Sequence, residues 1–244
     1  MTTTPSFIRN LGKVSKTWLD SGLYGQFINA ARLDAWKVAL KKHNPPRDAI
    51  VDVGCAYGSW ADNWRALGFK RICGIDPNPD VMEQARATMD EVHTAFSSQL
   101  AEHFPLNHLC AANGVIVHIL EDEHSIAFLR DIASTLEPGG LLIYSVINAD
   151  YYFNAGRKEW FGPNSCVRTL DTQRRFAAEA GLEILDEIGT FIDPWALPEL
   201  EFIAADETLR EQPETYQTFI DLANLCRARS VAPFSEMLFV ARPK

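Results

Sequence analysis

Short apolar runs alternate with helical segments through the middle of the chain. The segments at 59–67, 79–89 and 123–136 have helical periodicity. Runs of four to nine mostly apolar residues between segments of this kind are typical of parallel strands covered on both faces. The runs that predict strands are "AIVDVG", "RICGID", "VHTAF", "HLCAANGVI" and "GGLLIYSVI". The pattern predicts an α/β fold with a doubly wound, mostly parallel sheet.

The alternation changes after residue 147. Residues 148–170 are aromatic and irregular, and residues 192–232 form a second insertion, in which Pro213 is well placed to begin a helix. A helix at 171–180 and two further runs, "LEILDEIGTF" and "SEMLFVAR", bring the number of strands to seven. We therefore expect one domain over 1–244. It comprises an N-terminal helical cap at 1–47, a core at 48–147, 171–191 and 233–244, and insertions at 148–170 and 192–232. In the cap, residues 16–43 are expected to be helical, either as one helix or as two hinged near Gly22 and Gly25.

The two insertions follow late strands, whose carboxyl ends border the ligand in open α/β sheets. Both are longer than the ~12–15 residues beyond which connections are usually functional or disordered. We expect them to form a mobile cover over a substrate. A dimer interface is the alternative use for the apolar face of the second insertion, so the chain is expected to be a monomer or a homodimer.

The charge of the chain limits its partners. The sequence has 23 Lys and Arg against 32 Asp and Glu, a net charge of −9. Because non-specific nucleic-acid binding is mostly electrostatic, an acidic protein disfavours a nucleic-acid substrate. We expect a small-molecule substrate and no nucleic-acid partner.

Cysteine usage and the apolar segments suggest the compartment. The five cysteines are odd in number and show no CxxC pairing, which favours packed, reduced thiols over a disulfide frame or a metal site. The N-terminus lacks the apolar core of a signal peptide, and no segment approaches the ~20 apolar residues of a membrane span. We expect a cytoplasmic protein with no metal and no membrane partner.

The stretch "VDVGCAYGSW" at 51–60 ends a strand in a glycine-containing turn. Glycines at such a turn let the backbone approach a ligand closely. The next strand ends at Asp76, about twenty residues on, where an acid can accept both hydroxyls of a ribose. Together they predict an adenosine-type ligand. The simpler alternative is a tight turn and an Asp that begins the next helix.

The spacing separates two kinds of adenosine ligand. A dinucleotide turn reads G-x-G-x-x-G and places a pyrophosphate at a helix N-terminus. Here the turn is Gly54-x-Ala56-x-Gly58, and Asp52 precedes it inside the strand. An acid at that point would repel a pyrophosphate but suits a ligand that bears an ammonium and a sulfonium. A nicotinamide-dependent oxidoreductase remains a weaker alternative.

The sequence resembles the class I S-adenosylmethionine-dependent methyltransferases over residues 48–190. "VDVGCAYGSW" is similar to their first motif, with Ala56 where glycine is usual, and "GIDPNP" to their second. "AANGVIVHILEDEHSIAFLRDIASTLEPGGLLIYSV" resembles their fourth strand, helix and fifth strand. The resemblance implies a Rossmann-like seven-stranded sheet and S-adenosyl-L-methionine as cofactor. The cofactor-binding residues that it implies are Asp52, Gly54, Cys55, Ala56, Gly58, Asp76, Pro77, Ser98 and Asn113.

Two positions depart from the family pattern. His108 stands at the start of the fourth strand, where members often carry an acid. Members also often carry an Asp after the third strand that meets the adenine amino group, and this chain has "FSSQL" there. Ser97, Ser98 or Gln99 would then have to serve.

Candidates for the chemistry lie after the fourth strand and in the insertions. His118 can act as a general base near neutral pH, or it can be a helix-entry histidine that faces solvent or the adjacent acids. Aromatic side chains at 151–153 and 160–161 can clamp a flat substrate or form a satellite core. Arg168 can bind a substrate anion or pair with an acid of the protein. The substrate-binding candidates are Tyr24, Tyr151, Tyr152, Trp160 and Arg168.

The leading hypothesis is methyl transfer from S-adenosylmethionine to nitrogen or oxygen of a small molecule. A domain that binds S-adenosylmethionine or S-adenosylhomocysteine without catalysis is the principal alternative.

Overall fold

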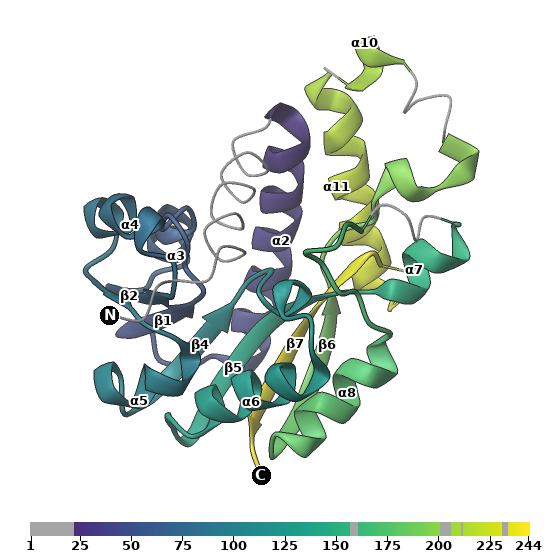
Figure 1. The fold of residues 1–244 in the computed structure, drawn as a ribbon. Helices are drawn as coiled ribbons and strands as arrows, with labels where there is room; N and C mark the ends of the chain where they lie inside the picture. Colours follow the sequence, from purple (N-terminus) through teal and green to yellow (C-terminus); the bar gives the residue numbers. More distant parts are fainter. Residues whose placement is uncertain (1–21, 157–160, 201–205, 211, 231–233) are drawn as a thin grey trace.

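The computed structural model describes residues 22–156, 161–200, 206–210, 212–230 and 234–244. It contains a seven-stranded sheet of order β3-β2-β1-β4-β5-β7-β6 (Figure 1). Strand β7 is antiparallel to both β5 and β6, and the other neighbours are parallel. The strands are β1 Ala49–Val53, β2 Arg71–Asp76, β3 Glu91–Thr94, β4 Asn107–Ala112, β5 Leu136–Ile147, β6 Leu182–Gly189 and β7 Glu236–Pro243. The predicted Rossmann-like, mostly parallel sheet is confirmed.

Helices cover both faces of the sheet, as expected for a doubly wound fold. The α-helices are α2 Gly22–His43, α3 Ala61–Ala66, α4 Met82–Thr88, α5 Leu100–His103, α6 Asp122–Ala133, α7 Ala149–Asn154, α8 Leu170–Glu179, α10 Glu207–Arg210 and α11 Pro213–Ala228. Short 3-10 turns lie at η1 Pro79–Val81, η2 Ser97–Gln99, η3 Ile116–His118, η5 Pro194–Ala196 and η6 Pro198–Leu200. Helix α11 begins at Pro213, as the sequence predicts.

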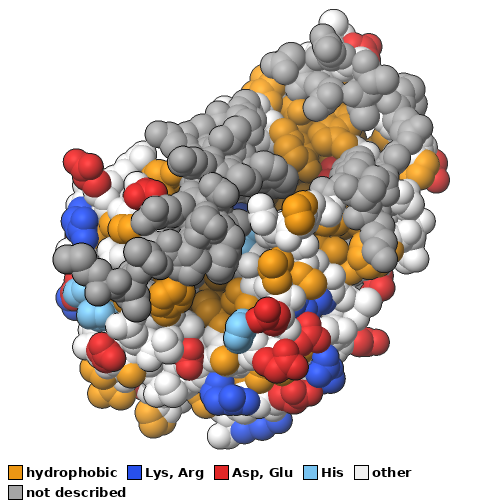
Figure 2. All heavy atoms as spheres, in the orientation of Figure 1, with side chains coloured by type: hydrophobic (Ala, Val, Ile, Leu, Met, Phe, Trp, Pro, Cys, Tyr) orange, Lys and Arg blue, Asp and Glu red, His pale blue; other side chains and the backbone are white. Residues whose placement is uncertain are grey.

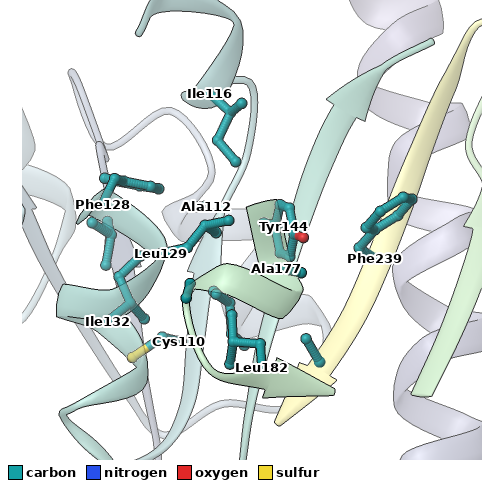
Figure 3. Close-up of a cluster of buried hydrophobic side chains, with 14 of the residues drawn as sticks. Cys110, Ala112, Ile116, Phe128, Leu129, Ile132, Tyr144, Ala177, Leu182 and Phe239 are labelled. Atoms are coloured by element: carbon teal, nitrogen blue, oxygen red, sulfur yellow. The ribbon is translucent and has the colours of Figure 1, made fainter. Parts of the chain in front are cut away.

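The alternation of strand residues divides the core in two. In β1, Val51 and Val53 pack with α5, α6 and α8 on one face, and Ile50 packs with α2, α3 and α4 on the other. Figure 3 shows part of the first cluster, in which Leu129 and Ile132 of α6 approach the sheet. Because successive strand residues point to opposite faces, Asp52 lies on the same face as Ile50.

Helix α2 is continuous through Gly25, so the predicted hinge at that residue is wrong. Gly25 is buried, and the helix packs against α11, β6 and β7 along its length. Trp36 of α2 meets Trp64 of α3 edge to face, with ring centroids 4.6 Å apart. Because Gly25 is itself buried in this packing, the helix continues through the glycine.

The apolar face of α11 is buried within the chain. Tyr216 and Phe219 pack with Phe27 of α2 and with Trp195, and Ala223 packs with the tyrosines of α7. The two insertions therefore share a core with α2. The buried part of this face is thus occupied within the chain, and a homodimer stays a prediction.

Asp193 connects the three segments that build this outer core. The residue is 2% exposed, and its Oδ2 atom accepts hydrogen bonds from the Tyr24 hydroxyl at 2.9 Å and the Tyr152 hydroxyl at 3.0 Å. Its Oδ1 atom accepts from the backbone N–H of Trp195 at 3.1 Å, and its carbonyl oxygen accepts from the Tyr151 hydroxyl at 2.7 Å. Burial raises the pKa of the Asp193 carboxyl, and the hydrogen bonds of the two tyrosines oppose this rise.

Among the described residues, no helix combines the length and apolarity that a bilayer span requires. The five cysteines are free, and Cys55, Cys73 and Cys110 are buried. The packed thiols predicted from the sequence are thus seen for these three.

We expect Asp193→Ala to lower the free energy of unfolding by roughly 2–4 kcal/mol, because the hydroxyls of Tyr24 and Tyr152 and a backbone donor lose their hydrogen bonds to this carboxylate. Tyr152→Phe removes only one of these bonds and should cost about 1 kcal/mol. Chemical denaturation of both variants measures the difference. Equal losses in the two variants would contradict a shared role for Asp193.

Candidate functional site

A cavity of about 750 Å³ lies at the carboxyl ends of the central strands. Its walls come from the turn after β1, the end of β2, the loops after β3 and β4, and one side of α6. Figure 2 shows hydrophobic side chains gathered around the middle of the face presented in Figure 1, with acidic, basic and histidine side chains intermixed below them. The cavity occupies the edge where open α/β sheets bind their ligands.

The turn after β1 forms the floor of the cavity. The backbone N–H groups of Gly54 and Cys55 donate to the Ile75 carbonyl of β2, at 2.8 and 3.1 Å. Gly54 has φ +80°, and a Cβ atom there would lie 2.5 Å from Cγ2 of Val115. A side chain at Gly54 therefore conflicts with both the backbone angle and the cavity wall.

Ala56 adopts φ +47° although it is not glycine, at the position where the resembling family usually has one. This conformation is uncommon for a residue with a Cβ atom. It is held by a hydrogen bond from the Ala56 N–H to Oδ2 of Asp76 at 3.0 Å. Gly58 lies farther along, against Thr88 and Ala85 of α4, and is not among the described residues that line the cavity.

Asp76 lies at the end of β2 and lines the cavity. Its second oxygen, Oδ1, accepts from the Asn78 N–H at 2.9 Å. Burial raises the pKa of this carboxyl, and the two backbone hydrogen bonds oppose the rise. Each oxygen of an ionised carboxylate can accept more than one hydrogen bond, so Asp76 can hold the turn and also accept hydroxyls of a ligand.

Asp52 is 4% exposed and its Oδ2 accepts a 2.9 Å hydrogen bond from Nε1 of Trp64. Burial raises the pKa of Asp52 to about 7; the Trp64 hydrogen bond lowers it, and the charge of Asp76 adds to the rise. Asp52 therefore titrates in the physiological range and is more readily ionised when a cation enters the cavity.

Asn113 and Arg32 are two hydrogen-bond donors that also line the cavity. The side-chain oxygen of Asn113 accepts from Nε1 of Trp36 at 3.1 Å, and its Nδ2 atom is buried with no hydrogen-bond partner among the described residues. Arg32 of α2 is 8% exposed and lines the cavity, with Nε and Nη2 donating to Glu236 at 2.8 and 2.6 Å. Arg32 is not among the site residues predicted from the sequence, although it is the one arginine of the helical segment at 16–43 and stands among apolar positions.

His118 stands in η3, and it lines the cavity. Its Nδ1 lies 3.3 Å from the carbonyl oxygen of Asn164, which can only accept. The neutral ring then carries its proton on Nδ1, which leaves Nε2 as an acceptor. Burial lowers the pKa of His118, so the neutral form predominates at pH 7.

The substrate-binding candidates lie elsewhere. The described residues of the two insertions include none that line the cavity, and Tyr24, Tyr151 and Tyr152 surround Asp193 instead. Aromatic packing explains their position, since they fill the core that joins α2 to the insertions. Trp160 lies outside the described residues.

Arg168 is 6% exposed and its guanidinium is fully engaged within the protein. Its Nε donates to Asp122 at 2.9 Å, and Nη2 donates to the carbonyls of Ile119 and Leu120 at 3.0 and 3.1 Å. Of the two roles that the sequence allows for Arg168, the structure shows the pairing with an acid of the protein. Arg168 fixes the loop that follows η3, beside the cavity.

Of the predicted cofactor-binding residues, all but Gly58 line the cavity. They are Asp52, Gly54, Cys55, Ala56, Asp76, Pro77, Ser98 and Asn113. The carboxylates of Asp52 and Asp76 suit a ligand that has cationic groups and hydroxyls. The unpartnered amide N–H of Asn113 suits an acceptor on the same ligand, and Gly54 leaves room for it beside the backbone. Among the described residues, no group of three or more His, Cys, Asp or Glu is placed to hold a metal ion.

The methyltransferase-domain family matches residues 24–187, more than half of the chain. The chain belongs to this family, and it is an S-adenosylmethionine-dependent methyltransferase. The adenosine-type ligand inferred from the glycine turn and Asp76 is therefore S-adenosylmethionine, and not a nicotinamide dinucleotide.

Two relatives and one solved structure show the breadth of the similarity. The chain is 24% identical over 227 residues to the ubiquinone biosynthesis O-methyltransferase of Bradyrhizobium sp. (strain ORS 278), covering 80% of this chain and 87% of that protein. It is 22% identical over 232 residues to the mRNA cap guanine-N(7) methyltransferase of Schizosaccharomyces pombe, covering 82% and 64%. The magnesium protoporphyrin IX methyltransferase of Synechocystis PCC 6803, solved with bound S-adenosylhomocysteine, shares the fold with a TM-score of 0.60 at 14% identity, covering 90% of this chain and 87% of that one.

The raised pKa of Asp52 predicts a pH-dependent stability. Between about pH 4 and about pH 7, folded Asp52 keeps a proton that the unfolded chain has released. The contribution of this group to stability is thus present at low pH and is lost as pH rises through about 7. Denaturation across this range should show a steeper decline for the wild type than for Asp52→Asn, which keeps the acceptor for Trp64. Parallel pH profiles would contradict the assignment.

Proposed function

We propose that the methyl acceptor is a small molecule that reacts through nitrogen or oxygen. The charge of the cavity carries this proposal. Four carboxylates line the described part of it, from Asp52, Asp76, Glu121 and Asp131. Arg32 is the one lysine or arginine among the described lining residues, and Glu236 already neutralises it. A neutral or cationic acceptor fits these walls better than a polyanion.

Individual residues are proposed to hold the cofactor as follows. Asp76 accepts the ribose hydroxyls, and the turn at Gly54 lets the backbone lie against the ligand. Asp52 stabilises the cationic groups through its charge. Arg32 and Asn113 line the cavity. The guanidinium of Arg32 and the unpartnered Nδ2 of Asn113 are the proposed donors for the carboxylate of the methionine moiety.

The bound cofactor supplies an electrophilic methyl group on its sulfonium. The protein's share of the reaction is to orient the acceptor, exclude water and remove a proton if the nucleophile arrives protonated. We assign the last task to His118, whose neutral ring has Nε2 as its acceptor. Ile119 and Leu120 beside it supply an apolar wall for the acceptor.

The relatives leave RNA as the competing acceptor class, because one of them is an mRNA cap methyltransferase by name. RNA binding depends strongly on basic groups that contact phosphates. The net charge of −9 and the acidic cavity both oppose it. On the described part of the face in Figure 2, basic side chains are interspersed with acidic ones and do not form a stripe.

Transfer of a radiolabelled methyl group tests the acceptor class. The protein is incubated with labelled S-adenosylmethionine and, in parallel, with a metabolite extract or with total RNA. We expect label in the small-molecule fraction only. Label confined to RNA would overturn the proposal. Cofactor binding without any labelled product would favour the non-catalytic binding domain.

His118→Gln should lower turnover of the acceptor found in this way by roughly 10²–10⁴-fold, the usual contribution of general acid–base catalysis. The calorimetric affinity for S-adenosylhomocysteine should stay unchanged, because glutamine keeps a polar side chain in the same wall. The wild-type rate should fall as pH falls through the lowered pKa of His118. Full activity of the variant would show that the acceptor reacts without this base.

A further inference from the structure

The adenine end of the cavity lacks the acid that the resembling family often carries after its third strand. The residues after β3 are Ala95, Phe96, Ser97 and Ser98, and all four line the cavity. The next residue, Gln99, turns back, and its Oε1 lies 3.4 Å from the N–H of Phe96. This loop therefore supplies no carboxylate for the exocyclic amino group of adenine, and its side-chain acceptors at the cavity are serine hydroxyls.

The carboxylate of Asp131, on α6, lies at the cavity wall that the loop after β3 forms. Asp131 lines the cavity, and its Oδ2 accepts a hydrogen bond from the Ser97 hydroxyl at 2.8 Å. His124, Ala127 and Phe128 line it too, and their spacing from Asp131 places all four on one side of the helix. Residues 34 positions apart in sequence thus meet at one wall.

In the cofactor placement proposed above, adenine lies beside Ser97 and Asp131. In the sheet order, β1 carries Asp52, β2 carries Asp76, and β3 leads into Ser97. A ligand whose cationic part lies near Asp52 and whose ribose lies on Asp76 continues toward the loop after β3. Ala95 and Phe96 supply the apolar wall for the base, and Phe96 is 48% exposed.

We infer that Asp131, oriented by Ser97, accepts the exocyclic amino group of the cofactor's adenine in place of the acid missing after β3. An ionised carboxylate has about four acceptor positions, so Oδ1 and the second lone pair of Oδ2 can serve the ligand while Ser97 holds the group. This assignment rests on the cofactor placement proposed above and does not depend on the identity of the methyl acceptor.

Glu121 is the other acid from the α6 region that lines the cavity. Its side chain is 66% exposed, and its Oε2 atom lies 2.6 Å from Nδ1 of His124. It has no contact with the loop after β3 among the described interactions. Glu121 is therefore the matched control, an acid in the same cavity with a different partner.

Ligand discrimination tests the inference without requiring turnover. Calorimetry compares S-adenosylhomocysteine with its deaminated analogue, in which an oxo group replaces the amino group. A hydrogen bond to a charged group predicts a wild-type preference for S-adenosylhomocysteine of about 10-fold or more. Asp131→Ala should abolish most of this preference, Asp131→Asn should keep part of it through the amide oxygen, and Glu121→Gln should keep all of it.

Asp76→Ala provides the second comparison, because losing the ribose acid should weaken both ligands by the same factor. Thermal unfolding of each variant confirms that it is folded. A preference that survives in folded Asp131→Ala overturns the inference, as does equal loss of affinity for both ligands in that variant. A wild type that binds both ligands equally also overturns it. None of these outcomes bears on whether the acceptor is a small molecule or RNA.

Discussion

The attachment of the turn after β1 to the end of β2 is the constraint on which the site depends. The carbonyl of Ile75 accepts from two successive N–H groups of the turn, and the carboxylate of Asp76 accepts a third. These bonds hold Gly54 and Ala56 at positive φ, which unsupported residues with side chains rarely adopt. The Asp76 carboxylate that fixes the floor of the cavity is held by the same bonds, so the floor and this proposed ribose acid are positioned together.

Several charged side chains near the site are buried, and each has a hydrogen-bond or ion-pair partner close by. Asp52 has one indole donor and a pKa shifted to about 7. Arg32 and Glu236 form a two-bonded pair that Thr190 extends at 3.0 Å. Asp193 is surrounded by hydroxyl and backbone donors. Removing one partner of such a group leaves the other unsatisfied, so these groups keep the outer helices in one arrangement around the cavity.

The described residues of the two insertions do not form the walls of the cavity. Their tyrosines and α11 pack on α2 and on one another, away from the described cavity wall. Segment 148–170 still contacts the loop after β4. The Cys166 N–H donates to the Val117 carbonyl at 2.7 Å, and the Asn164 carbonyl lies 3.3 Å from Nδ1 of His118. Arg168 donates to the carbonyls of Ile119 and Leu120. The segment at 148–170 thus supports the loop that carries the candidate base. Whether the two insertions also move over the acceptor remains a prediction.

The sequence by itself determined the sheet, its two covered faces and the cofactor turn. These features follow from local rules, namely the period of two in strands, the helical period between them, and glycine where φ is positive. It did not reveal Arg32 or Asp131 as cavity residues, or Asp193 as the centre of the outer core. Each of these acts through a partner far along the chain, at Glu236, Ser97 or Tyr24. Only the tertiary structure decided them, because packing brings those side chains together and no short-range pattern records which distant residues will meet.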